Sequence, residues 1–253
     1  MSSKVRWSLP DGVDELLPPK AIEVEKLRRK LIDEYIDSGY EFIIPPLLEL
    51  SESIGGEAHD EIQSYAFTFK DNLTGKDLSI RPDISEQASR IDAYRIQSND
   101  AVKLCYAGEV VKSKSSKILR SRTTIQVGAE IFGDSSMAAE LESIKLMLKS
   151  LEISGIKDIT LGIGHAGFTA SVLNQFKQLG QEKLTLIEKA LSKKSISDLE
   201  NLVPNEHKYK ASILTLCEMY GDLDIISKAK EEFAYLDSSK ESLSHLETIV
   251  NQL

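Results

Sequence analysis

The first part of the chain carries apolar residues at helical spacing. This stretch covers residues 21–40. Its apolar stripe includes Leu27, Leu31 and Tyr35, which recur every three to four positions as one face of a helix requires. Gly39 follows the stripe, where a residue in the left-handed conformation commonly ends a helix. The pattern therefore predicts a long amphipathic helix that stops at this glycine.

The next part of the chain has patterns typical of β-strands. Residues 41–50, "EFIIPPLLEL", predict a short strand that is stopped by its two prolines, which a central ladder does not tolerate. Residues 65–83 alternate aromatic and polar side chains around "NLTG" and predict a hairpin. Two further β-rich runs, residues 102–113 and 123–133, flank a polar loop. They predict a second antiparallel pair joined by a long loop.

Helical patterns return between and after these strands. Residues 85–96 predict a helix for which Ser85 is the candidate N-cap, and residues 135–156 predict another helix. "KDITLGIGH", residues 157–165, predicts one more strand.

The pattern becomes almost wholly helical at residue 166, and this change predicts the domain organisation. We expect an α+β core over residues 1–165, built on an antiparallel sheet flanked by helices. We expect a helical appendage over residues 166–253.

Composition narrows the classes of function. The 253 residues include 41% hydrophobic ones, enough for a real core, and 31 Lys and Arg against 40 Asp and Glu give a net charge of -9. This balance argues against a broad nucleic-acid surface. No apolar run is long enough to predict a membrane span, and no secretory leader is evident. Neither the two cysteines nor the four histidines have a spacing that predicts a metal site or a disulfide framework.

Three ordered strings resemble the catalytic domain of class II aminoacyl-tRNA synthetases, in its histidyl branch. "DSGYEFIIPPLLEL" resembles motif 1, "SIRPDISEQ" resembles the family's Arg-Pro-Glu-Gly-Thr segment, and residues 104–133 resemble motif 2. The resemblance extends from about Leu9 to Gly164. It implies the class II antiparallel sheet and a homodimer formed through motif 1. The chain ends at Leu253, before the family's histidine-specific strand and motif 3, so we expect a short or partial form.

The resemblance also implies a histidine-binding site. In the histidyl family the α-ammonium is held by an acid and a hydroxyl, matched here by Asp83 and Ser85, and by two residues of motif 2, matched here by Gln126 and Glu130. Converging carboxylates and neutral oxygens suit an ammonium group without a metal. Simpler interpretations stay open at this point. Asp83 and Ser85 would also serve as helix caps, and the two motif 2 residues would also suit an exposed strand end.

Motif 2 departs from the synthetase pattern where that pattern binds ATP. Synthetases have Phe-Arg-x-Glu there, and this chain has Val111 followed by Lys112, Ser113 and Lys114. A lysine does not replace the bidentate arginine fork, and a cation replaces the carboxylate, so we expect no adenylate formation.

Five cations gather in and around the loop of motif 2. These are Lys112, Lys114, Lys117, Arg120 and Arg122. Such a run suits a solvated loop as well as an anion site. Arg120 and Arg122 match positions that contact nucleotide in synthetases, so an anion site at these two arginines stays open beside the solvated loop.

An amino-acid pocket beside an altered ATP site points to a regulatory paralogue. "LPDGVDELLPP", "CYAGEV" and "QVGAEIFG" resemble the regulatory-subunit family of ATP phosphoribosyltransferase. That resemblance implies a non-catalytic cytoplasmic protein without a cofactor, which activates the short catalytic subunit in a hetero-octamer. It also implies histidine feedback inhibition of the first step of histidine biosynthesis. Two alternatives are a catalytic fragment of a histidyl-tRNA synthetase and a stand-alone amino-acid-binding module.

Overall fold

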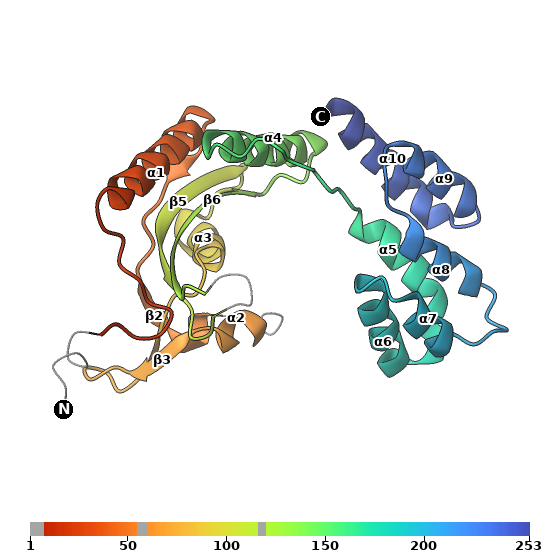
Figure 1. The fold of residues 1–253 in the computed structure, drawn as a ribbon, viewed down its shortest axis with the longest axis horizontal. Helices are drawn as coiled ribbons and strands as arrows, with labels where there is room; N and C mark the ends of the chain where they lie inside the picture. Colours follow the sequence, from red (N-terminus) through yellow and green to blue (C-terminus); the bar gives the residue numbers. More distant parts are fainter. Residues whose placement is uncertain (1–7, 55–59, 116–119) are drawn as a thin grey trace. The chain divides into compact units, whose positions relative to one another are not determined.

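The computed structural model describes residues 8–54, 60–115 and 120–253 (Figure 1). The chain forms two compact units, Met1–Asp158 and Ile159–Leu253, called unit 1 and unit 2 below. Unit 1 contains all the strands found in the described residues, and unit 2 is helical.

Sheet A of unit 1 has three strands in the order β1 (Glu41–Phe42), β5 (Val102–Val111) and β6 (Thr123–Phe132). The predicted pair β5 and β6 is confirmed, because the two strands are antiparallel over their full length. Strand β1 pairs with β5 in parallel, which the sequence pattern did not indicate.

Sheet B of unit 1 contains the predicted hairpin. Its order is β2 (Leu48–Leu50), β4 (Asp77–Ile80) and β3 (Phe67–Lys70), with every pairing antiparallel. The single strand predicted for residues 41–50 is wrong, because β1 and β2 belong to different sheets. Pro45 and Pro46 lie between them, and a proline has no N–H to continue a ladder.

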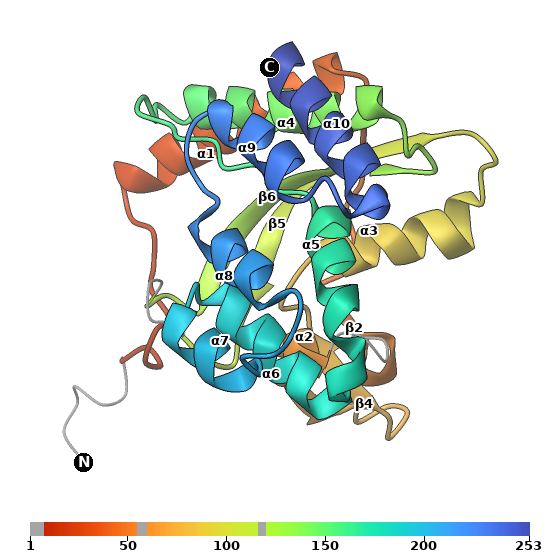
Figure 2. The same cartoon turned by 90° about the vertical axis from the view of Figure 1, so that its right-hand side faces the viewer.

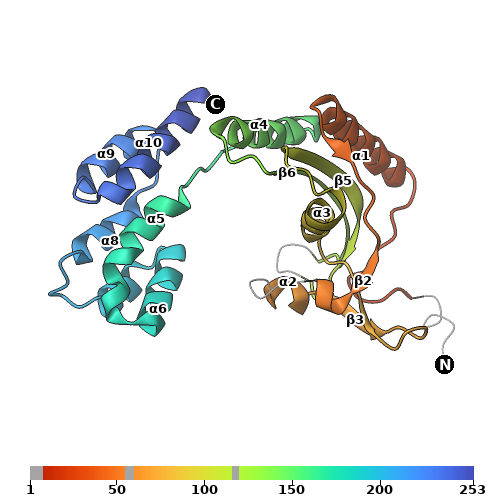
Figure 3. The ribbon, with the colours of Figure 1, turned by 180° about the vertical axis from the view of Figure 1, so that it is seen from behind.

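Helices cover both faces of sheet A (Figures 1 and 3). Helices α1 (Lys20–Asp37) and α4 (Met137–Ile153) cover one face, and α3 (Ser85–Ile91) covers the other. The predicted stop of the first helix is confirmed, because Gly39 has a φ of 88° just after α1 ends. A π-helical turn, Asp92–Ile96, continues α3. In the described part of this unit, the remaining short helices are α2 (Asp60–Ser64) and a 3-10 turn at Ser51–Ser53.

The alternation of side chains along the strands explains the two packed faces. Successive residues of a strand point to opposite sides of the sheet. Cys105 is fully buried in a cluster with Tyr35 and Leu146, on the side of α1 and α4. Leu104 is fully buried in a different cluster with Ile84, on the side of α3. Sheet A is thus the middle layer of a three-layer α+β unit.

Unit 2 packs its helices around one hydrophobic core. Figure 2 shows the helices of this unit at the front. The helices are α5 (Ala166–Leu173), a 3-10 stretch (Asn174–Leu179), α6 (Gln181–Ser192), α7 (Ile196–Leu202), α8 (Lys210–Glu218), α9 (Asp224–Glu232) and α10 (Asp237–Gln252). Phe176, Ile187 and Phe233 are completely buried in this core. The helical pattern predicted from residue 166 onward is confirmed.

The strand predicted for residues 157–165 is wrong, because this segment has no regular structure. A strand needs a neighbour to satisfy its N–H and C=O groups, and no described strand pairs with this segment. His165 instead caps α5, where its side chain accepts a hydrogen bond from the Gly167 N–H. Over the described ranges, no helix is both long and apolar enough to cross a membrane.

Candidate functional site

The four residues predicted to hold an ammonium group lie together in unit 1, at the start of α3 and on the adjoining face of sheet A. Asp83 and Ser85 lie at the start of α3, and Gln126 and Glu130 lie on β6. The two residues of β6 are four positions apart, so they point to the same side of the strand. The register places Gln126 opposite Gly108 of β5. We call these four residues, together with Tyr106, the polar cluster.

Asp83 and Gln126 are held to each other and to the first turn of α3. The Asp83 carboxylate accepts hydrogen bonds from the Ser85 N–H at 2.7 Å and from the Gln126 side-chain nitrogen at 3.3 Å. The Gln126 side-chain oxygen accepts from the Ile84 N–H at 2.9 Å. In this arrangement Gln126 orients Asp83, and its own oxygen is already occupied by the backbone.

The prediction that Ser85 is the N-cap of α3 is wrong. Ile84 precedes the helix at the N-cap position and provides no side-chain cap. The helix start is satisfied by Asp83 and Gln126, so the Ser85 hydroxyl is left for another partner. That partner is the Tyr106 hydroxyl, 2.9 Å away.

Tyr106 completes the polar cluster, and sequence reasoning did not single it out. Its side chain is buried, and its hydroxyl donates to the Glu130 carboxylate at 3.0 Å. Burial and the neighbouring carboxylate of Glu130 raise the pKa of Tyr106 above its ordinary value, although Ser85 acts in the opposite direction. Its place depends on Gly128, directly opposite on β6, because a side chain there would collide with the Tyr106 ring. A tyrosine facing a glycine is a usable signal only once the strand register is known.

The polar cluster can accept a cation. It contains two carboxylates, and the hydrogen bonds to Asp83 and Glu130 each involve only one of their two oxygens. The other oxygen of each receives no hydrogen bond from the described residues. Both side chains are partly exposed, so solvent or a ligand has access to them. Converging carboxylate oxygens of this kind form charge-assisted hydrogen bonds with an ammonium group.

Of the two arginines of the motif 2 loop, one is held by contacts within the chain and the other is exposed. Arg122 donates to the backbone oxygens of Asp11 and Lys112, both at 3.1 Å, and its guanidinium lies 4.7 Å from the centre of the Phe67 ring. The side chain of Arg120 is exposed. The proposed anion-binding role of these two arginines stays a prediction.

Lys112 and Lys114 are exposed, and the ammonium of Lys114 lies 5.7 Å from the centre of the Tyr65 ring. Lys117 lies outside the described residues.

A groove of unit 1 lies away from the polar cluster. It runs between α1 and α4, and its lining includes Glu34, Leu141 and Lys145. These helices cover the face of sheet A opposite α3, and none of the predicted site residues lines the groove. The groups suited to binding an ammonium group therefore lie in the polar cluster and not in this groove.

Comparison with known families identifies the chain's relatives. A family model described as histidyl-tRNA synthetase matches residues 12–253. The ATP phosphoribosyltransferase regulatory subunit of Cellvibrio japonicus is 34% identical, over 96% of this chain and 62% of that protein. The subunit of the same description from Saccharophagus degradans is 38% identical, over 90% of this chain and 58% of that protein. The chain spans less than two thirds of the length of these relatives.

Solved structures show the same fold. One, described as an ATP phosphoribosyltransferase regulatory subunit/histidyl-tRNA synthetase from Bacillus halodurans, matches with a TM-score of 0.82 at 20% identity, over 98% of this chain and 65% of that one. Histidyl-tRNA synthetase from Nostoc matches with a TM-score of 0.70 at 19% identity, over 97% of this chain and 56% of that one. The predicted fold class, a class II synthetase-like α+β core followed by helices, is confirmed.

Proposed function

The chain belongs to the histidyl-tRNA synthetase family, and from this premise we propose that it is a regulatory protein that binds histidine without activating it. Its role is that of a regulatory subunit of ATP phosphoribosyltransferase. It activates the short catalytic subunit, assembles with it as a hetero-octamer in the cytoplasm, and mediates feedback inhibition by histidine in the first step of histidine biosynthesis. The relatives described as such regulatory subunits support this assignment.

One observation carries the choice between regulator and enzyme. The polar cluster keeps two carboxylates for an ammonium group, whereas motif 2 has Lys112, Ser113 and Lys114 in place of the arginine and glutamate that position ATP in synthetases. Adenylate formation needs preorganised groups around the transferring phosphate. A chain with the amino-acid half of the site and an altered ATP half is suited to sensing histidine.

We also propose that two copies pair through motif 1. The segment from Phe42 to Leu48 exposes a row of apolar side chains, and Ile44 is 85% exposed. Strand β1 lies at the edge of sheet A, where unpaired backbone groups favour a further partner. Exposed apolar surface beside a sheet edge is usually covered in the assembled protein. A second copy of the chain is the partner proposed here.

The test is histidine inhibition of the complex reconstituted from a short catalytic subunit and the regulatory chain at the full length of its relatives. Glu130→Gln removes a charge from the polar cluster with little change of shape. It should raise the inhibition constant about ten-fold or more, because a hydrogen bond to a charged group contributes about 1.5–3 kcal/mol. Asp83→Asn should act in the same direction. Activation of the catalytic subunit should be largely retained in both.

Glu152→Gln is the matched control. Glu152 is an exposed carboxylate of α4 that pairs with Lys149, away from the polar cluster, so its loss should leave inhibition unchanged. Unchanged inhibition by histidine in both cluster variants would refute the site. Histidine-dependent pyrophosphate exchange above background, abolished by Glu130→Ala, would instead restore the interpretation as a synthetase fragment.

A further inference from the structure

Arg81 is a buried charged residue that lies two positions before Asp83 and outside the polar cluster. Arg81 is only 6% exposed, and it follows strand β4 directly. Burying a guanidinium is costly unless hydrogen bonds replace its lost water. The partners that replace this water show what the side chain holds in place.

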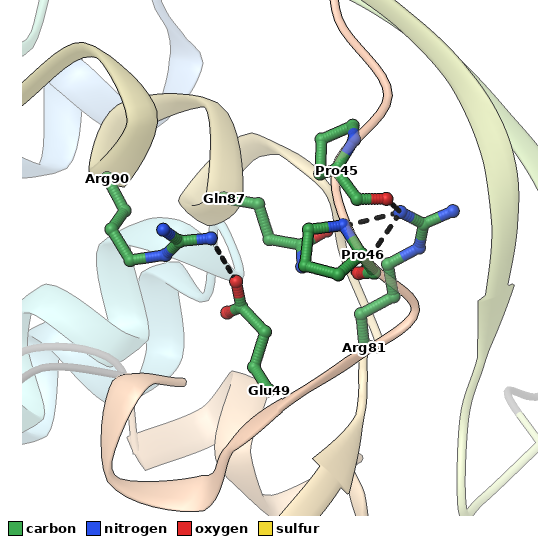
Figure 4. Close-up of polar contacts among 6 residues, drawn as sticks. All are labelled: Pro45, Pro46, Glu49, Arg81, Gln87 and Arg90. Atoms are coloured by element: carbon green, nitrogen blue, oxygen red, sulfur yellow. Dashed lines mark hydrogen bonds and ion pairs between the residues drawn. The ribbon is translucent and has the colours of Figure 1, made fainter. Parts of the chain in front are cut away.

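The guanidinium of Arg81 joins three parts of unit 1, and Figure 4 shows its contacts with the segment of Pro45 and Pro46 and with Gln87 of α3. It donates to the backbone oxygen of Glu109 on β5 at 2.8 Å. It also donates to the backbone oxygen of Pro45 at 2.8 Å and to the Gln87 side chain of α3 at 3.3 Å. Gln87 in turn donates to the backbone oxygen of Pro46 at 2.8 Å. We call residues 45–47 the proline segment.

The backbone of Arg81 strengthens the same junction. Its N–H donates to the oxygen of Leu47 at 3.1 Å, and its oxygen accepts from the Val111 N–H at 3.0 Å. Main chain and side chain together therefore fix the proline segment against β5 and α3. The acceptors of the guanidinium are all neutral oxygens, and burial lowers the pKa of Arg81.

Gly108 connects Arg81 to the polar cluster. A side chain at position 108 would collide with the guanidinium of Arg81, so this glycine creates the space that the arginine fills. Gly108 is directly opposite Gln126, and residues opposite each other in a ladder point to the same face. The guanidinium therefore lies on the face from which Gln126 reaches Asp83 and the Ile84 N–H.

We infer that Arg81 is a positioning residue for the polar cluster: it fixes the turn of residues 82–84 and the face beside Gln126, and thereby sets the affinity for the ligand that Asp83 binds. This inference deepens the proposed function and rests on it for the identity of the ligand. Among the described residues, Arg81 forms no hydrogen bond with Asp83, Glu130 or Tyr106. Its effect on the ligand is exerted through the backbone of the turn and through Gln126.

The first measurement is calorimetric titration with L-histidine of the regulatory chain at the full length of its relatives. Arg81→Gln removes the charge and most of the donors, and it should weaken histidine binding about ten-fold or more, as expected when charge-assisted contacts lose their alignment. Gly108→Ala keeps the arginine and displaces its guanidinium, so it should weaken binding in the same direction. It also serves as the second variant if Arg81→Gln fails to fold.

The matched control is Arg90→Gln. Arg90 of α3 pairs with Glu49 of β2, near the end of motif 1 (Figure 4). This control therefore also loosens α3 from motif 1, but it leaves the hydrogen bonds of Arg81 in place. This control should change the dissociation constant for histidine by less than about two-fold, which corresponds to about 0.4 kcal/mol. An equal loss of affinity in this control and in Arg81→Gln would mean that general loosening of α3 is responsible, and would overturn the inference.

Amide hydrogen exchange without ligand separates this inference from the proposed function. In Arg81→Gln and Gly108→Ala, the amides of Ile84 and Ser85 should exchange faster than in the wild type, while those of the β3 and β4 hairpin change little. Uniformly faster exchange across unit 1 would show a merely structural role. If the wild type binds no histidine, the proposed ligand is wrong, and the exchange pattern still decides whether Arg81 positions the turn.

Discussion

Substitution of Gly128 by alanine tests whether the close packing of Tyr106 against β6 holds the polar cluster together. The new methyl group would lie within 2.8 Å of the Cε2 atom of the Tyr106 ring and closer still to its hydroxyl end. The ring is buried and 2% exposed, so it cannot swing into solvent without unpacking its surroundings. The expected response is a shift of the ring that breaks its hydrogen bonds to Ser85 and Glu130.

The magnitude follows from those two bonds. Loss of the neutral bond to Ser85 costs about 0.5–1.5 kcal/mol, and loss of the bond to the Glu130 carboxylate costs about 1.5–3 kcal/mol. Replacing glycine also restricts the unfolded chain, which restores about 0.4–1 kcal/mol. The free energy of unfolding of unit 1 should therefore fall by about 1–4 kcal/mol in Gly128→Ala.

Urea unfolding followed by far-ultraviolet circular dichroism measures this change. The two compact units can unfold in separate transitions, so the midpoint of the unit 1 transition is compared at constant slope. Gly162→Ala is the matched control, because no atom lies within 4 Å of the added methyl group. Gly162 belongs to unit 2, so in this control the midpoint of the unit 2 transition should be unchanged or slightly raised, and that of unit 1 should be unchanged. In a Tyr106→Leu background, Gly128→Ala should lower the free energy of unfolding of unit 1 much less than it does in the wild type. An equal decrease in both backgrounds would refute the collision with the Tyr106 ring as the cause.

Arg28 holds the pKa of Glu25 at about 2, below its ordinary 4.5, so the stabilising contribution of this carboxylate is complete above 4.5 and is lost as the pH falls through about 2. Carbon NMR should show this pKa and its rise in Arg28→Gln; an ordinary value in the wild type would contradict the contact. Burial raises the pKa of Cys105 to about 11 and also raises that of Cys217. Neither thiol should therefore react with Ellman's reagent at about pH 8 until urea unfolds the chain, and rapid reaction in the native state would be inconsistent with their burial. Ile44→Lys should convert the proposed dimer to monomers in sedimentation at micromolar concentration, whereas a wild-type monomer would exclude this interface.

The elements that could be predicted from the sequence are those whose signal is local. The helix before Gly39 has apolar residues every three to four positions and a glycine that ends it. The hairpin around "NLTG" has alternating side chains and a turn sequence. The strand predicted for residues 157–165 depends on a neighbour, and the residues of a segment do not reveal whether a neighbour is present. The prolines at 45 and 46 signalled a break, but not that the two sides join different sheets.

The candidate site follows the same division. Gln126 and Glu130 share a face because of their spacing, so their proximity could be expected from the sequence alone. Tyr106 could not be assigned a role without the register that places it opposite Gly128. The hydrogen bond that the Ile84 N–H donates to the Gln126 side-chain oxygen joins residues 42 positions apart, and only the folded chain brings them together.

The alternating faces of β6 restrict how this strand can change in length during evolution. Gln126, Gly128 and Glu130 face α3, whereas Val127 and Ala129 pack on the side of α1 and α4. Because the side-chain period is two, one residue inserted into the strand ahead of them would exchange the two faces and bury the amide and the carboxylate beneath the long helices. Insertions or deletions of two residues would preserve both faces. Viable length changes on this side of the ladder are therefore confined to even steps, unless a β-bulge absorbs the extra residue.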